Sequence, residues 1–329
     1  MALIWAESFK DDRAIAPHWL RVVETKKRAE DRSLSHAERG QALEEHEDAV
    51  AEYDALVSKA ESYFENEANA GNPKTHALII GVGRYQNGIK EVTTSVHGAR
   101  TFAEWMLTKF YHPERPLASI EYLESSPDDL GDWIVEDPVA SQMGLASPRA
   151  TLPGEPATFE NIENAFERWL KRSGFHLENA AFFYFSGHGV WKAKAFLLAE
   201  DAQLPDDNQQ SAKNLIDIQQ TEVNLFNAPP SIQCFFIDAC QDIPLALLQN
   251  LAPNPGDALK KPANAPALAQ RDAHLYFGSH IAQEAFGPEN DAPFFTQELM
   301  ACLEHRAAAE VLDENSDLWV VRTDSLWSD

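Results

Sequence analysis

The stretch "AFFYFSGHGVW", residues 181–191, decides which kind of fold this chain can form. A continuous apolar run that ends in glycine is typical of a strand buried on both faces of a parallel sheet. A second run of this kind, "SIQCFFIDAC" at 231–240, ends in Cys240. Helical patterns alternate with these strands along the chain. The sequence therefore predicts a three-layer α/β/α sandwich with a mostly parallel central sheet.

The composition excludes several classes of partner. The chain of 329 residues has 52 acidic and 27 basic side chains, a formal net charge of −25. Such a surface repels nucleic acid and anionic lipid, whereas it attracts basic peptides. No stretch approaches the roughly 18 consecutive apolar residues of a membrane span, and the N-terminal sequence lacks the basic start of a signal peptide. With three cysteines and no disulfide framework, we predict a cytoplasmic protein.

Residues 1–72 predict a helical appendage. Ser35 and Glu38 have the spacing of a capping box, which begins a helix. Apolar residues then follow at spacings of three and four: Val50, Tyr53, Val57, Ala60 and Phe64. The preceding stretch 18–32 predicts an antiparallel partner helix, so the two form a hairpin. Two interpretations are open: a hairpin packed on its own domain, or a regulatory surface for a protein partner.

Residues 73–310 predict the main domain. Its expected strands are "HALIIGVG", "SIEYL", "AAFFYFSG", "AFLLA", "SIQCFFIDA" and "AHLYFGS", and its expected helices are "VHGARTFAEWMLTKF", "TFENIENAFERWLKR", "TEVNLFNA" and "FFTQELMACLEHR". Thr158 is the expected N-cap of the second helix. A long acidic loop separates "SIEYL" from that helix.

Two segments near the C-terminus have other predicted roles. Residues 249–270 are rich in Pro, Ala and Asn and predict a flexible linker within the main domain. Residues 311–329 predict the start of a further element, so we expect a chain that continues into another domain or was cut short.

Reactive residues follow two of the predicted strands. In open α/β sheets, active sites form beyond the carboxyl ends of strands. His188 and Cys240 occupy that place and suit nucleophilic catalysis, in which the thiolate attacks a carbonyl and the imidazole transfers the proton. Gly187 permits a tight turn, and Gly189 allows a backbone N–H to approach a substrate oxygen. That N–H and the Cys240 N–H are the candidate oxyanion hole.

These motifs resemble a known family. "FFYFSGHG" and "FFIDAC" are similar to the paired motifs of caspase-fold and metacaspase-like cysteine peptidases, whose His precedes the Cys by about 50 residues. "HALIIGVGRYQN", "HGARTFAEWML", "LYFGSHIAQEAFG" and "APFFTQELMACL" resemble further elements of that fold. The resemblance covers residues 75–307. It implies a cysteine endopeptidase with His188 as general acid and base, Cys240 as nucleophile and Gly189 as oxyanion donor.

The resemblance also implies a substrate. Caspases bind Asp before the scissile bond through arginines and a Gln two residues before the Cys. That position here is Asp238, and residues 272–290 contain no Arg or Lys. A carboxylate pocket selects Arg or Lys instead, as in metacaspases. The alternative for Asp238 is a structural carboxylate that caps nearby N–H groups. Ser279 is assigned to the same substrate site. The second pocket acid of metacaspases is absent, since the matching pair is His97–Gly98.

Further expectations concern control. Some metacaspases need calcium, and Asp201, Asp206, Asp207 and Asp217 lie near the family's calcium region, but they lack recognisable ligand spacing. We therefore predict no metal or cofactor, with calcium as an open alternative. Lys260 and Lys261, in the linker, are candidate sites of self-cleavage, and Lys260 is favoured because Pro262 follows Lys261.

Alternatives stay open at this point. The chain could be a catalytically inactive caspase-like adaptor that binds partners through residues 1–72. A separase-like or CHAT-type peptidase shares the His and Cys strands. Serine hydrolases are excluded because Tyr184 stands where the G-x-S-x-G elbow needs its first glycine. Bacterial relatives of such peptidases often serve regulated proteolysis, stress responses or antiviral defence, which is background of the family that no residue of this sequence shows.

Overall fold

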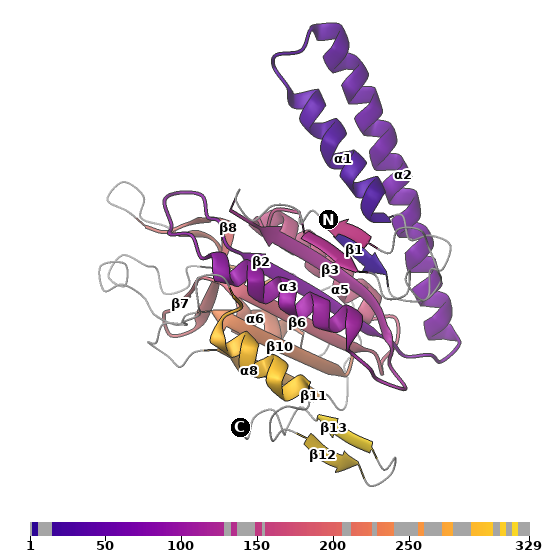
Figure 1. Ribbon diagram of the computed structural model, residues 1–329, viewed down its shortest axis with the longest axis vertical. Coiled ribbons are helices and arrows are strands. Elements are labelled where there is room, and N and C mark those ends of the chain that lie inside the picture. The colour runs from indigo at the N-terminus through magenta and orange to yellow at the C-terminus, as the bar shows by residue number, and fades with distance from the viewer. Residues whose placement is uncertain are drawn as a thin grey trace.

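The computed structural model describes residues 2–5, 15–127, 133–136, 149–152, 155–205, 212–225, 229–239, 256–259, 272–278, 291–304, 310–313 and 318–321. A six-stranded sheet forms its centre, in the order β1-β3-β2-β6-β10-β11 (Figure 1). The strands are β1 (Ala2–Trp5), β3 (Leu117–Ser125), β2 (Thr75–Val82), β6 (Ala180–Gly187), β10 (Ile232–Ala239) and β11 (Asp272–Phe277). All neighbours pair in parallel except β1, which runs antiparallel to β3. The predicted mostly parallel sheet is confirmed.

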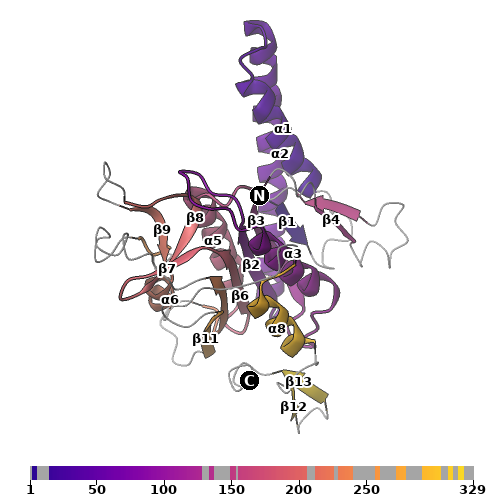
Figure 2. The same cartoon turned by 60° about the vertical axis from the view of Figure 1, so that its left-hand side comes forward.

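Helices cover both faces of this sheet. On one face, α3 (Thr93–Thr108) and α8 (Phe294–Leu303) pack through Phe102 and Met300 onto aromatic residues of the strands. On the other face lies α5 (Phe159–Ser173), whose Phe166 and Trp169 pack against Phe183 and Phe235. These three layers are the predicted α/β/α sandwich (Figures 1 and 2).

A second, three-stranded sheet of β7 (Gly189–Trp191), β8 (Ala195–Gln203) and β9 (Lys213–Asp217) lies beside the carboxyl ends of the central strands. The short helix α6 (Ile218–Asn224) follows β9 directly, and the Asp217 carboxylate caps it by accepting from the Gln220 N–H at 2.8 Å. Residues Gly256–Leu259, inside the segment predicted as a linker, dock here. Their backbone bonds to Leu215 and Asp217, and the Leu259 side chain is fully buried. This part of the segment is anchored.

The predicted helical hairpin is present. It consists of α1 (Ile15–Glu30) and α2 (His36–Asn69), which pack along each other and project away from the sheet (Figure 1). The capping box is confirmed, since Glu38 accepts from the Ser35 N–H at 2.9 Å and the Glu38 N–H donates to Ser35 Oγ at 3.4 Å. Tyr53 of the predicted seam is buried.

The acidic region predicted as one long loop contains two strands. β4 (Trp133–Glu136) and β5 (Arg149–Leu152) form an antiparallel pair outside the central sheet. A further antiparallel pair, β12 (Glu310–Asp313) and β13 (Leu318–Val321), lies near the C-terminus (Figure 2). The sequence predicted the start of a further element at the second place and a loop without strands at the first.

A buried ion pair joins α5 to the sheet. Arg172 and Glu121 of β3 are both inaccessible to solvent, and the Arg172 Nη1 donates to Glu121 Oε1. The Arg168 Nε lies 3.3 Å from the other oxygen of Glu121. Nearby, the Trp169 indole donates to the His76 carbonyl at 3.1 Å. Removing one member of such a pair leaves a buried charge, so this layer contact depends on both partners. In the described part of the chain, no helix has the length and hydropathy needed to cross a bilayer.

Candidate active site

His188 lies between β6 and β7, at the carboxyl edge of the central sheet. Its backbone N–H donates to the Tyr85 hydroxyl at 2.6 Å, and its carbonyl accepts from the Leu198 N–H at 3.0 Å. The Tyr85 and His188 rings lie 4.9 Å apart. A Cβ on Gly187 would come within 2.8 Å of the same hydroxyl, so the glycine makes room for this contact. Contacts with Tyr85 and Leu198 thus hold His188 in place.

The hydrogen bond of the His188 ring determines its tautomer. Nε2 lies 2.8 Å from the carbonyl oxygen of Lys90. A carbonyl can only accept, so the proton of the neutral ring is on Nε2 and Nδ1 carries the lone pair. Burial lowers the pKa of His188, although its bond to the Lys90 carbonyl opposes this effect. The ring is therefore a neutral base near neutral pH, and its Nδ1 has no partner among the described residues.

Cys240 lies outside the described residues, as do Ser279, Lys260 and Lys261. The strand register nevertheless bears on the Cys–His pairing. β6 and β10 are adjacent and parallel, and Gly187 pairs with Ala239. The residue that follows Gly187 is His188, and the residue that follows Ala239 is Cys240. The two strands thus end side by side at the same edge, as the sequence predicted.

Asp238 is buried, with 3% of its surface exposed. Its Oδ2 accepts from the Thr296 N–H at 3.2 Å and from the Thr296 hydroxyl, so the carboxylate caps the first turn of α8. Its Oδ1 is buried and has no hydrogen-bond partner among the described residues. Burial raises the pKa of Asp238 to about 6, despite the two bonds from Thr296. The predicted pocket carboxylate therefore has one oxygen engaged and one unsatisfied.

Hydroxyl groups lie beside Gly98, where the resemblance to metacaspases would place a second pocket acid. A Cβ on Gly98 of α3 would lie 2.7 Å from the Tyr184 hydroxyl and 3.3 Å from Thr296 Oγ1. The hydroxyls of Tyr184 and Thr296 are themselves in hydrogen-bond contact. Gly98 therefore makes room for a chain of hydroxyl groups that ends on Asp238.

The candidate calcium ligands that the structure describes are engaged with the protein. Asp201 accepts from the Phe159 N–H at 2.9 Å and from the Asn214 amide at 2.8 Å. Asp217 caps α6 and forms an ion pair of 2.9 Å with Lys194. Asp206 and Asp207 lie outside the described residues. Among the residues with described positions, no three His, Cys, Asp or Glu side chains could share a metal ion.

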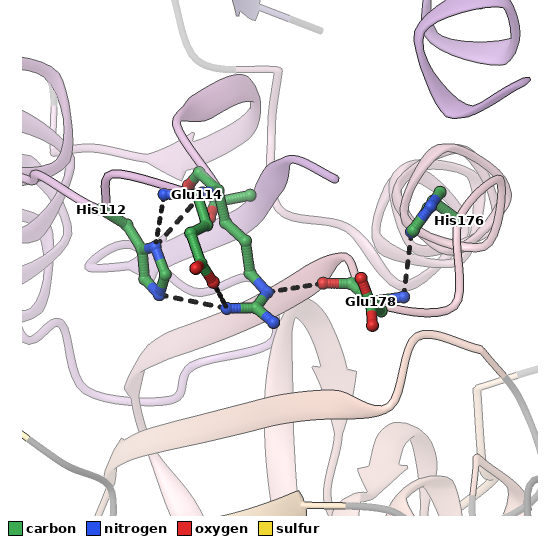
Figure 3. A network of polar contacts seen from close by, with 6 residues as sticks. His112, Glu114, His176 and Glu178 are labelled. Atoms are coloured by element: carbon green, nitrogen blue, oxygen red, sulfur yellow. Dashed lines mark hydrogen bonds and ion pairs between the residues drawn. The ribbon is translucent and has the colours of Figure 1, made fainter. Parts of the chain in front are cut away.

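A second polar cluster lies at the opposite, amino edge of the sheet (Figure 3). The His112 Nδ1 accepts from the backbone N–H groups of Glu114 and Arg115, at 3.3 and 3.2 Å. The Arg115 Nε donates to the Glu178 carbonyl at 2.7 Å, and the Glu178 N–H donates to His176 Nδ1 at 3.1 Å. Burial and the charge of Arg115 lower the pKa of His112. These bonds join the turns that precede β3 and β6.

Sequence reasoning missed four groups of the site: Tyr85, the Lys90 carbonyl, Tyr184 and Thr296. Tyr85 could have been found, because it follows a predicted strand at the edge where His188 also lies. Thr296 opens the predicted helix "FFTQELMACLEHR", but nothing in the sequence pairs it with Asp238. The contribution of Lys90 is a backbone atom, which leaves no signal in the residue type.

Comparison with known proteins agrees with this geometry. Residues 74–318 match the caspase-domain family. The chain is 27% identical over 256 residues to a probable protease of a Desulfuromonadales bacterium, a match that covers 76% of this chain and 28% of that protein. It is 23% identical over 182 residues to the uncharacterized protein y4kE of Sinorhizobium fredii, covering 53% of this chain and 51% of that protein.

The chain thus spans about a quarter of the first relative and about half of the second. The family match extends over most of the chain and includes both strands that end at the candidate site, β6 and β10. The parallel sheet, the helices on its two faces and the histidine at the end of β6 fit the same assignment. The chain belongs to the caspase-domain family.

Proposed function

We propose that the chain is a cysteine endopeptidase that cleaves polypeptides after Lys or Arg, with Cys240 as nucleophile and His188 as general acid and base. The observation that carries this proposal is the pairing of Gly187 with Ala239, because it ends the two strands side by side immediately before His188 and Cys240. The fixed His188 ring, with Nδ1 left to accept a proton, supports the role of base.

The proposed reaction uses these groups in two stages. Nδ1 of His188 takes the thiol proton, and the sulfur attacks the peptide carbonyl, whose oxygen becomes an oxyanion. The N–H groups of Gly189 and Cys240 stabilise that oxyanion. His188 then gives the proton to the leaving amine, which leaves a thioester. Water attacks the thioester with His188 as base, and the carboxylic acid product and the free thiol result.

Asp238 supplies the proposed selectivity. Its charge attracts a basic side chain before the scissile bond, and its unsatisfied Oδ1 has unused capacity to accept from a cation. A second candidate function is that of a non-catalytic adaptor, which the hairpin of α1 and α2 favours because it projects away from the sheet (Figure 1). A regulatory partner on this hairpin, calcium dependence and self-cleavage after Lys260 or Lys261 remain predictions.

A panel of fluorogenic peptides that differ only in the residue before the cut tests the proposal. We expect turnover of the Lys and Arg peptides by the wild type and none by Cys240→Ala. A Cys-reactive peptide probe should label the wild type at Cys240. Labelling of Cys240 would count against the adaptor, whereas the absence of both labelling and turnover would favour it. Efficient cleavage after Asp would refute the role of Asp238.

A further inference from the structure

We propose that Thr296 is a specificity-determining residue: by engaging one oxygen of Asp238, it makes the substrate pocket accept lysine at least as well as arginine. This inference rests on the proposed function, since it concerns the same pocket. It follows from how the lone pairs of one carboxylate are used, and it separates two substrates that the charge of Asp238 alone does not distinguish.

The first step concerns the number of acceptor sites. An ionised carboxylate has two oxygens and about four lone-pair sites. The Oδ2 of Asp238 receives two donors from Thr296, its N–H and its hydroxyl. The capacity of Oδ2 is thus taken up by the first turn of α8, and Oδ1 keeps both of its sites.

The second step concerns what holds Thr296 in this role. The hydroxyl of Thr296 donates to Asp238, so its oxygen accepts the proton of Tyr184 in their mutual contact. Burial and the nearby charge of Asp238 raise the pKa of Tyr184, so the phenol stays a donor. Gly98 leaves the space for this chain, because a Cβ there would lie 2.7 Å from the Tyr184 hydroxyl. Tyr184, Thr296 and Asp238 thus form one directed series of hydrogen bonds.

The third step concerns the open oxygen. None of the described Lys or Arg side chains forms an ion pair with Asp238, and a buried carboxylate oxygen without a donor is costly. Gly278, at the end of β11, borders Oδ1, since a Cβ there would lie 3.1 Å from it. A cation that reaches Oδ1 therefore gains a charge-assisted bond that none of the described residues supplies.

Lysine and arginine differ in how they use a single oxygen. Arginine usually binds a carboxylate more strongly than lysine does, because its guanidinium donates two parallel hydrogen bonds, one to each carboxylate oxygen. This pair of bonds needs a site on Oδ2, which Thr296 occupies. The ammonium of lysine is a compact charge with three rotatable donors, and it binds Oδ1 alone without loss. The arrangement therefore removes the usual advantage of arginine.

The test compares matched Lys and Arg peptides with the wild type, Thr296→Val and Thr296→Ser. We expect kcat/KM for Lys at least equal to that for Arg in the wild type. Thr296→Val frees a site on Oδ2 and should raise the Arg-to-Lys ratio by about 10-fold, the equivalent of one charge-assisted bond. Thr296→Ser keeps both donors and should keep the wild-type ratio. A merely structural role would lower both rates without moving the ratio.

A wild type with a higher kcat/KM for the Arg peptide than for the Lys peptide would overturn the inference, as would an unchanged ratio in Thr296→Val. Binding gives a readout without turnover: product tetrapeptides that end in Lys or Arg are titrated into Cys240→Ala and into Cys240→Ala/Thr296→Val by calorimetry. The same shift in the Arg-to-Lys ratio is expected for binding. If the peptides bind to Cys240→Ala/Asp238→Asn as tightly as to Cys240→Ala, Asp238 does not form the substrate pocket. Loss of turnover with the binding ratio as expected would instead count against the proposed catalysis alone.

Discussion

Histidines lie at both edges of the central sheet, and their ring nitrogens are used differently. At the amino edge, His112 and His176 accept backbone N–H groups through Nδ1 and thereby stabilise two turns. At the carboxyl edge, His188 donates from Nε2 to the Lys90 carbonyl, and its Nδ1 has no partner among the described residues. A histidine whose accepting nitrogen is engaged holds structure, whereas one whose accepting nitrogen is left open can move a proton. The partner of Nδ1 distinguishes the two edges.

The largest expected effect is on the carboxyl edge. His188→Ala removes the base, and we expect kcat for a basic peptide to fall about 10³-fold, while the thermal midpoint changes little. His188→Gln is the matched control, because its amide can still donate to the Lys90 carbonyl without acting as a base. Turnover by either variant within tenfold of wild type would show that His188 is not the proton carrier.

The interior between the two edges should show the largest effect on stability. Arg172→Met leaves the buried Glu121 with the Arg168 contact alone among the described residues, and we expect a loss of about 3 kcal/mol in the free energy of unfolding. The double variant Arg172→Met/Glu121→Gln should recover part of this loss. Denaturant titration measures both. Equal stability of Arg172→Met and wild type would mean that the pair contributes nothing to the contact between α5 and the sheet.

The titration of Asp238 at the carboxyl edge should make the stability of the protein depend on pH. Its folded pKa of about 6 exceeds the ordinary value of 3.8, so the fold prefers the protonated form. This contribution is present below pH 4 and is lost as the pH rises through 6, a total of about 3 kcal/mol. Asp238→Asn should lack that component, so its unfolding free energy relative to wild type should increase between pH 4 and 7. A constant difference across this range would contradict the raised pKa.

A smaller effect is expected from changing Tyr85, which holds His188 in place. Tyr85→Phe keeps the ring beside the imidazole and removes the hydroxyl that accepts from the His188 N–H. We expect kcat to fall about 5- to 10-fold with KM unchanged, the equivalent of about 1 kcal/mol. Steady-state kinetics separates the two constants. A change in KM alone would place Tyr85 in substrate binding instead.

The smallest effect is expected at the amino edge. His112→Ala removes the acceptor for two turn N–H groups, and we expect about 1 kcal/mol of destabilisation with kcat/KM unaltered. The N–H groups are partly exposed to water, which limits the loss. His112→Asn retains a side-chain acceptor, so its stability should lie between those of the wild type and His112→Ala. A drop in kcat/KM at 25 °C would show that the two edges are coupled.

Much of this arrangement could be predicted from the sequence. The strands around Phe183 and Phe235 have an unmistakable apolar run, and parallel strands place the residues that follow them at one edge. His188 and Asp238 were therefore located correctly at that edge, and the capping box of Ser35 was confirmed. These features depend on local pattern, which a sequence displays directly.

The rest depended on contacts between distant residues. Thr296 and Asp238 are 58 residues apart, and His188 and Lys90 are 98 apart. Neither pairing follows from a local pattern. The pair of strands β4 and β5 was missed because each is only four residues long and the region between them is rich in turn-forming residues. The positions of Cys240 and Ser279 lie outside the described residues.

The anchored residues Gly256–Leu259 bear on when the chain could cut itself. A peptidase binds its substrate as an extended segment, so the residues before Lys260 would have to be separated from β9 and α6 first. Undocking Leu259 exposes a fully buried side chain, which costs about 2 kcal/mol. At that cost the released form is on the order of one molecule in thirty. Self-processing after Lys260 would then proceed from this small population, and its rate would follow the strength of the anchor.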